Sequence, residues 1–216
     1  MSSRTTVLAR IRGALADVPA GEAVEIPGGY ERSLGLPPAA IVDLLAERIA
    51  DYRARVVRVG DAGELPARLA GVLAAEGAGR ICVPADLDPG WVSGLDTVAD
   101  TGLDGPALDA LDGVVTGCLL AIAETGTIVL DGGARSGRRV ATLVPDLHLC
   151  IVLAADVVGT VPEAMEALAA SGRRAAPLTL ISGPSATSDI ELERVEGVHG
   201  PRRLIVLIVE DAGRNG

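Results

Sequence analysis

The sequence predicts an α/β protein: a mostly parallel sheet with flanking helices, preceded by an N-terminal helical arm. Two observations lead to this prediction. Short runs that are apolar at every position alternate with helical or turn-like segments through most of the chain, and such runs are typical of parallel strands buried on both faces. The chain also has 216 residues, of which 49% are hydrophobic, so it is long and apolar enough to bury a sizeable core.

The first part of the chain predicts a helix followed by a connector. Apolar residues at helical spacing indicate an amphipathic helix over about residues 5–17. Residues 18–38 contain several prolines and glycines, which is typical of a linking segment. The Pro37-Pro38 pair then begins a second helix. We therefore expect an arm over residues 1–38 and one α/β domain over residues 39–213.

From residue 55 onward the expected elements alternate. Residues 55–59 and 80–84 predict strands, and between them Asp61 and Glu64 match a capping box for a helix that runs to Gly77.

A short helix is expected near 106–111, and another after Thr160-Val-Pro162. Apolar runs predict the remaining strands, at 113–115, 126–130, 147–153, 177–181 and 204–209.

Composition and charge exclude several classes of function. All 19 basic residues are arginines, so the chain has no lysine for a Schiff base or a P-loop. The net charge of −10 opposes binding to nucleic acid, and one Trp with two Tyr offers little surface for base stacking.

The sequence indicates a soluble cytoplasmic protein. Its apolar runs are shorter than a membrane span, and its N-terminus lacks the continuous apolar stretch of a signal peptide. The chain has an odd number of cysteines, and these lie far apart in the sequence, at Cys82, Cys118 and Cys150. This pattern supports neither a disulfide framework nor an iron–sulfur cluster. The two histidines are also distant from each other, so no metal site is expected.

Ligands of open α/β sheets bind at the carboxyl ends of the strands, so the loops after strands are the places to search. The first unusual loop is Ser182–Glu191, where small hydroxyl residues follow a Gly-Pro turn. Hydroxyls and exposed amides favour an anion such as a carboxylate. The alternative is a polar loop that ends in a helix cap, because Ser188 and Glu191 also match a capping box.

The second loop, Gly197–Pro201, places His199 between glycines and a proline. Its imidazole is suited to general acid or base catalysis near neutral pH. A turn histidine bonded to backbone is an equally good interpretation.

The third loop is Ala123–Thr127, where Glu124 lies between two apolar runs. A carboxylate in such surroundings is a candidate base, nucleophile or hydrogen-bond acceptor. The alternative, slightly favoured by the residues alone, is a buried glutamate that ties a turn between strands.

Three weaker candidates remain. The Gly-rich segment Gly132–Arg139 could hold a phosphate with Arg138 and Arg139, although a solvated loop is the better interpretation. His148 begins an apolar strand and could simply cap it. Ser185, Asp189 and His199 include the residue types of a hydrolase triad, but no GxSxG motif surrounds the serine.

Taken in order, these motifs resemble the LUD-domain family. The resemblance is carried by Ala121–Leu130, Leu143–His148, Ile181–Glu191 and Gly197–Pro201, and it extends over about residues 40–210. It implies a Rossmann-like α/β fold related to sugar-phosphate isomerases, CoA transferases and formyltetrahydrofolate cyclo-ligase. It also implies a role in the oxidation of L-lactate to pyruvate, with iron–sulfur centres on partner subunits and no cofactor bound by this chain.

The sequence thus leads to a hypothesis of one shared site at the carboxyl edge of the sheet, for a small anionic metabolite. Glu124 and His199 are its candidate catalytic residues. The candidate substrate-binding residues are Thr125, Gly126, Thr127, His148, Gly183, Ser185, Thr187, Ser188, Asp189 and Glu191. Two alternatives stay open: an autonomous transferase or isomerase acting on a CoA ester or sugar phosphate, and a non-catalytic assembly or regulatory subunit.

Overall fold

The computed structural model describes residues 2–19, 28–172, 176–187, 195–197 and 199–211. Its contacts divide the chain into two units, Met1–Glu31 and Arg32–Gly216.

The first unit carries α1, which spans Ser3–Ala14. Ser2 caps this helix by accepting a hydrogen bond from the Thr5 backbone amide, and none of its residues is buried. The helix begins and ends a few residues before the range expected from its apolar spacing. The division after residue 38 stays a prediction.

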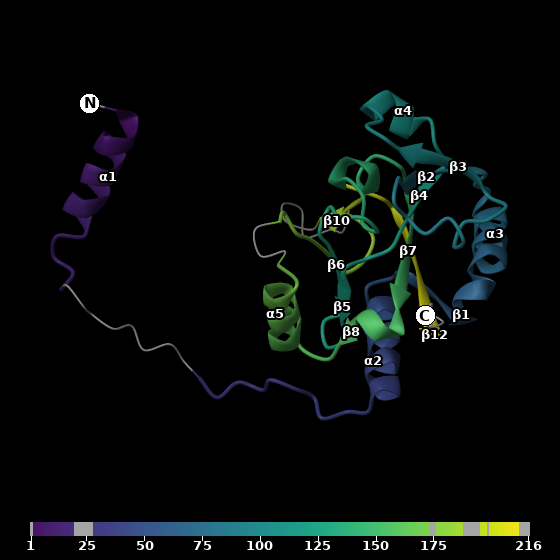
Figure 1. Ribbon diagram of the computed structural model, residues 1–216, viewed down its shortest axis with the longest axis horizontal. Coiled ribbons are helices and arrows are strands. Elements are labelled where there is room, and N and C mark those ends of the chain that lie inside the picture. Colours follow the sequence, from purple (N-terminus) through teal and green to yellow (C-terminus); the bar gives the residue numbers. More distant parts are fainter. Residues whose placement is uncertain (1, 20–27, 173–175, 188–194, 198, 212–216) are drawn as a thin grey trace. The chain divides into compact units, whose positions relative to one another are not determined.

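The second unit contains all the other helices and strands that are described (Figure 1). Its helices are α2 (Pro38–Asp51), α3 (Leu65–Glu76), α4 (Gly105–Asp109) and α5 (Val161–Ala170), with short 3-10 turns η1 (Ala62–Glu64), η2 (Arg139–Thr142) and η3 (Ala154–Asp156). Its strands are β1 (Arg55–Asp61), β2 (Arg80–Pro84), β3 (Asp96–Asp100), β4 (Gly113–Thr116), β5 (Leu120–Ile122), β6 (Thr127–Leu130), β7 (Leu147–Leu153), β8 (Val157–Val158), β9 (Thr179–Ile181), β10 (Ala186–Thr187), β11 (Val195–Glu196) and β12 (Arg203–Asp211).

A six-stranded sheet in the order β1-β12-β7-β4-β2-β3 forms the centre of this unit. Every neighbouring pair in it is parallel, which confirms the predicted α/β fold. The central strands β7 and β12 stay in register over seven positions, from Leu147 beside Arg203 to Leu153 beside Val209.

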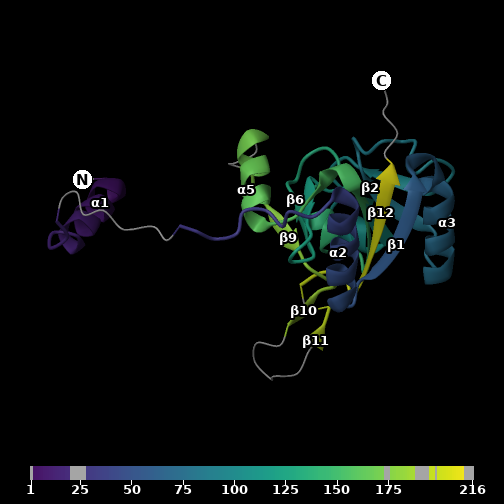
Figure 2. The ribbon, with the colours of Figure 1, turned by 90° about the horizontal axis from the view of Figure 1, so that it is seen from below.

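Helices cover both faces of this sheet (Figure 2). Alternate side chains of β7 point to opposite faces, as the period of a strand requires. Leu149 and Ile151 pack in a core with residues of α3, whereas Cys150 and Val152 pack in a second core with residues of α2. Burial on both faces explains why these strands are apolar at nearly every position.

A second sheet, in the order β8-β5-β6-β9, differs from the sequence prediction. The runs at 126–130 and 177–181 were expected to join the parallel sheet, but they provide β6 and β9, which pair antiparallel with each other. Strand β6 also pairs antiparallel with β5. Only four residues separate β5 from β6, and Gly126 turns the chain there with φ +61. Such a connection makes a hairpin and is too short for a parallel crossover.

Helix α5 packs on this small sheet through Ala164 and Leu168. Its N-terminus has a complete capping box between Thr160 and Glu163. The box expected at Asp61 does not form: Asp61 instead accepts from the Gly63 amide and begins η1.

The first residue of the second unit, Arg32, lies beside α5. Thr160 donates from Oγ1 to the Arg32 carbonyl at 2.9 Å, and Arg32 lies 3.2 Å from Glu166. Among the described residues, no helix is long and apolar enough to cross a membrane.

Candidate functional site

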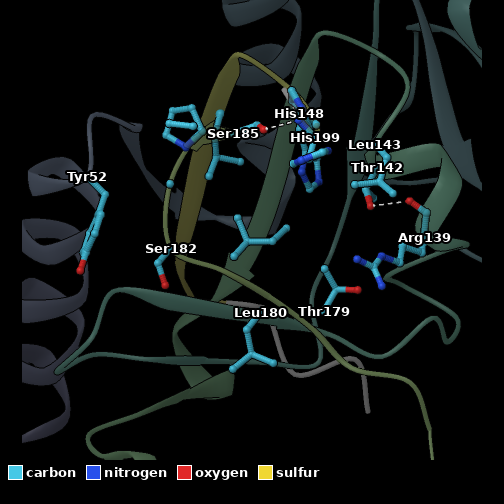
Figure 3. A pocket seen from close by; sticks show the side chains of 17 residues that line it. Tyr52, Arg139, Thr142, Leu143, His148, Thr179, Leu180, Ser182, Ser185 and His199 are labelled. Carbon is cyan, nitrogen blue, oxygen red and sulfur yellow. Dashed lines mark hydrogen bonds between the residues drawn. The ribbon is translucent and has the colours of Figure 1, made fainter. Parts of the chain in front are cut away.

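A cavity of about 520 Å³ opens beside the first residues of β7 and β12 (Figure 3). Two of its lining residues, His148 and Leu204, are each the second residue of their strand. Its other lining residues are Tyr52, Arg139, Thr142, Leu143, Thr179, Leu180, Ile181, Ser182, Gly183, Pro184, Ser185, Ala186, His199, Gly200 and Pro201.

The cavity therefore lies at the amino-terminal edge of the parallel sheet. The prediction that the candidate site lies at the carboxyl edge is wrong. The reason is the second sheet. The loop after Ile181 does follow a strand, but that strand is β9 of the small sheet, and the chain then runs through β10 and β11 into the start of β12. The rule for parallel sheets does not apply to a loop that connects one sheet to the beginning of a strand in another.

Two of the three loops singled out in the sequence meet at this cavity, and Ser185 joins them. Its backbone amide donates to the Pro201 carbonyl at 2.8 Å, and its carbonyl accepts from the Gly197 amide at 2.8 Å. Its Oγ accepts from the His199 backbone amide at 3.1 Å. The Ser185 side chain thus fixes the turn that carries the exposed His199.

Gly183 lets the first loop approach the end of α2. Its φ is +142, and a Cβ built there would lie 2.9 Å from both the Cβ and the carbonyl oxygen of Tyr52. A side chain at this position would push the loop away from Tyr52, so the glycine sets the width of the cavity on this side.

The third loop reaches the cavity through a row of hydroxyls. Thr125 donates to Thr127 Oγ1 at 2.8 Å, and Thr127 Oγ1 lies 2.8 Å from Ser182 Oγ. Either hydroxyl can be the donor in this second bond, and in both arrangements Ser182 Oγ keeps hydrogen-bonding capacity for a ligand. Gly126 holds the turn against α2: a Cβ there would lie 2.8 Å from the backbone of Arg48.

Glu124, from the same loop, is not among the described residues that line the cavity. Its Oε1 accepts a 2.7 Å hydrogen bond from the Val161 amide, the first residue of α5. A carboxylate at a helix N-terminus satisfies a free amide and interacts favourably with the helix dipole. This contact matches the interpretation of Glu124 as a residue that ties a turn, while its catalytic role stays a prediction.

His148 is the most buried titratable side chain of the cavity, at 1% exposure. Its Nε2 lies 2.8 Å from Thr116 Oγ1 on the neighbouring strand β4. Burial lowers the pKa of His148 from 6.5 to about 4, because a charged imidazolium loses its hydration there. The ring is therefore neutral at neutral pH.

The two arginines that end the Gly-rich segment have different surroundings. Arg138 donates to both carboxylate oxygens of Asp100, at 2.9 and 2.5 Å, and to the Leu103 carbonyl. These bonds lower the pKa of Asp100 below its usual value. Arg139 has no ion-pair partner among the described residues, and Figure 3 shows its guanidinium extending toward Thr179.

A smaller cavity of about 370 Å³ shares lining residues with the first. Arg139, Thr142 and Thr179 line both cavities. The sequence motif ending at His148 pointed to this region, but no local signal marked Thr179 or Tyr52 as site residues.

The charge of the cavity is opposite to that of the whole chain. The net charge is −10, yet none of the described lining residues is acidic and Arg139 supplies a cation. A ligand within a few ångströms responds mainly to these nearby groups rather than to the distant charges. The cavity is therefore suited to a small anion.

Some candidate residues cannot be placed in this site. Ser188, Asp189 and Glu191 lie outside the described residues, and of Thr187 the structure gives only its backbone, paired with Val195 in β10 and β11. Within the described part of the chain, no three His, Cys, Asp or Glu side chains come together in a group that could hold a metal ion.

Comparison with known proteins identifies relatives of the chain. Residues 106–209 match the LUD domain family. The chain is 47% identical over 192 residues to the lactate utilization protein C of Deinococcus radiodurans, a match that covers 88% of this chain and 89% of the relative. It is 40% identical over 94 residues to the lactate utilization protein C of Halalkalibacterium halodurans, covering 42% of this chain and 40% of that one.

A solved structure has the same fold. The crystal structure of a DUF162 family protein from Deinococcus radiodurans is 42% identical to this chain and superposes with a TM-score of 0.68. The match covers 81% of this chain and 99% of the other.

Proposed function

The chain belongs to the LUD-domain family, and we propose that it acts in lactate utilisation, as the subunit of an L-lactate-oxidising system that binds the small carboxylate. The observation that carries this proposal is the 47% identity to a lactate utilization protein C across 89% of that protein. A match of that extent covers most of the length of both proteins, rather than one motif.

The cavity supports a carboxylate ligand. Arg139 can form two parallel hydrogen bonds with a carboxylate, as guanidinium groups commonly do. Ser182 lines the cavity, and its Oγ keeps hydrogen-bonding capacity beyond its contact with Thr127. The volume of about 520 Å³ exceeds what a three-carbon acid fills, which leaves room for a group of a partner subunit to reach the ligand.

The redox step requires partners in this proposal. L-Lactate must lose two electrons and two protons to become pyruvate. The chain has three cysteines, fewer than the four thiolates that hold a typical iron–sulfur cluster, and all three are buried and separate from the cavity lining. Iron–sulfur centres on partner subunits would accept the electrons. His199, exposed at the cavity, remains the candidate acid or base for the protons.

Calorimetric titration of the purified chain with L-lactate tests the binding part of the proposal. Arg139→Gln should weaken binding roughly tenfold to a hundredfold, because a charge-assisted hydrogen bond is lost. Arg68→Gln is the matched control: this arginine lies on α3 in a surface ion pair with Glu64, and its loss should leave binding unchanged. Absence of lactate binding, or equal effects of the two substitutions, would contradict a carboxylate site at Arg139.

A turnover assay tests the role as a subunit. The chain alone should not convert L-lactate to pyruvate, and conversion should begin when the iron–sulfur proteins of the system are added. Turnover of a CoA ester or a sugar phosphate by the isolated chain would instead favour an autonomous transferase or isomerase. Binding without turnover in either setting would favour a regulatory subunit.

A further inference from the structure

Strand β9 is the last strand of the small sheet, and its outer edge borders the cavity. Thr179, Leu180 and Ile181 all line the cavity. Successive side chains of a strand point to opposite faces, so a cavity lined by three consecutive residues lies along the backbone edge of the strand. The inner edge of β9 is paired with β6. The cavity therefore follows the outer edge, which carries no strand among the described residues.

This outer edge presents peptide groups that other described residues do not bond. An antiparallel strand directs its amides and carbonyls alternately to its two sides, so the last strand of a sheet leaves some of each unpaired. Apart from the pairing with β6, no hydrogen bond joins the backbone of 179–181 to another described group. Leu180 is 62% exposed, so the strand can be reached from outside. Such a row of peptide groups pairs with the peptide groups of another extended chain.

The other edges of the two sheets carry charges that β9 lacks. At one edge of the large sheet, β1 carries Arg55, Arg58 and Asp61, and at the other edge β3 begins and ends with aspartates. The other edge of the small sheet is β8, which has two residues and follows Asp156. Charged side chains on an edge oppose pairing with another chain. The segment 178–183 has no charged residue and no proline, so β9 is the edge best suited to accept a strand.

Exposed hydrophobic residues surround this edge. Leu143, Tyr52 and Leu180 all line the cavity, and they are 37%, 49% and 62% exposed. Large hydrophobic side chains that share one part of a surface indicate contact with another molecule. A three-carbon acid leaves most of the volume of about 520 Å³ unfilled, so the cavity has room for an added strand beside its ligand.

We propose that β9 accepts an extended segment of a partner subunit as an added strand, so that residues of the partner complete the cavity around its ligand. This inference rests on the proposed role as a subunit and names the surface where the partner binds. The occupant is a polypeptide, because the amides and carbonyls along a strand edge have the spacing of another strand. A second copy of this chain is disfavoured, because each copy has a net charge of −10 and two copies repel each other.

The neighbours of β9 indicate the chemistry of the partner segment. Leu180 lies opposite Val129 of β6, which is buried in the core beneath α5. Side chains directly opposite each other on paired strands share one face of the sheet and contact each other. The residue of the added strand beside Leu180 would extend this apolar face, so we expect it to be apolar.

Amide hydrogen exchange, measured with and without the iron–sulfur proteins of the system, tests the added strand directly. At least one amide within 179–181 should exchange roughly tenfold or more slowly in the complex, because it gains a backbone hydrogen bond. The amides of β3, an edge strand with aspartates at both ends, should exchange equally in the two states. Association that leaves the exchange of β9 unchanged would overturn the inference.

A charge on the edge tests the same surface by affinity. Leu180→Lys should weaken association with the iron–sulfur proteins roughly tenfold or more, because the ammonium group would face the apolar strand of the partner. Leu180→Val keeps an apolar side chain that favours strands, and should retain most of the affinity. Met165→Lys is the matched control: Met165 is 58% exposed on α5 and is not among the lining residues of the cavity. Thermal unfolding of the three variants checks that each is folded.

The outcomes separate this surface from the role as a subunit. Unchanged affinity of Leu180→Lys, or equal losses in Leu180→Lys and Met165→Lys, overturns the docking surface and leaves the role as a subunit standing. Self-association of the chain that protects the amides of β9 overturns it as well, because the occupant would then be a second copy. Absence of any association with the iron–sulfur proteins overturns the subunit role together with its docking surface.

Discussion

The two walls of the cavity are built in different ways. One wall is the edge of the parallel sheet, where His148 and Leu204 are buried and lie on strands paired over seven positions. The other wall is made of loops, where Ser185 and the exposed His199 are held by hydrogen bonds between the two turns.

The difference indicates that the two walls have separate roles in ligand binding. A group on the sheet wall has its orientation set by buried neighbours, as His148 does by Thr116. A group on the loop wall can shift with a small change in the turns, because fewer contacts hold it. We therefore expect the sheet wall to decide which ligand is accepted and the loop wall to adjust around it. The following predictions test this contrast.

The largest expected effect is the pH dependence of stability caused by His148. In the unfolded chain the imidazole titrates near 6.5, whereas in the folded protein its pKa is about 4. Between these values the unfolded chain binds more protons, so the free energy of unfolding decreases as the pH falls from 6.5 to 4. His148 should account for up to about 3 kcal/mol of this decrease, and His148→Gln should remove that part.

Chemical denaturation at several pH values measures this effect. His199→Gln on the loop wall is the comparison variant, because it replaces the other of the two histidines of the chain. Identical curves for the two histidine variants would show that the walls do not differ in this way.

The second prediction concerns the backbone of the loop wall. Gly183→Ala should lower the free energy of unfolding by about 1–3 kcal/mol, because φ is +142 and the new Cβ would meet Tyr52. Gly71→Ala is the control: this glycine lies within α3 with nothing near its Cβ position, and the change should stabilise the helix by roughly 0.5–1 kcal/mol. Thermal unfolding of both variants compares them, and a neutral Gly183→Ala would mean that the loop moves away at little cost.

The smallest effect is expected from the hydroxyl that joins the two turns. Ser185→Ala removes the acceptor for the His199 amide and one donor from the cavity. Binding of L-lactate should weaken roughly threefold to tenfold, which corresponds to about 0.5–1.5 kcal/mol. The exposed Ser93 provides the control Ser93→Ala, which calorimetry should not distinguish from the wild-type protein. A loss of a hundredfold or more would show that the loop wall, rather than the sheet wall, dominates recognition.

Much of this organisation could be predicted from the sequence. The runs at 147–153 and 204–209 are apolar at nearly every position because both faces of β7 and β12 are buried. The glycines and small hydroxyls near Ser185 and His199 also singled out two loops, and residues of both loops line one cavity.

Only the tertiary structure decided which residues line the cavity and where the cavity lies. Arg138 and Arg139 are adjacent and chemically identical in the sequence, yet Asp100, far away in the chain, binds the first and leaves the second at the cavity. The runs that form β6 and β9 resemble the other buried strands, but pairing with each other takes them into a second sheet and moves the loops to the amino-terminal edge. Burial and turn formation depend on neighbouring residues and can be recognised locally, whereas strand partners and ion pairs depend on contacts between distant segments, which exist only once the chain has folded.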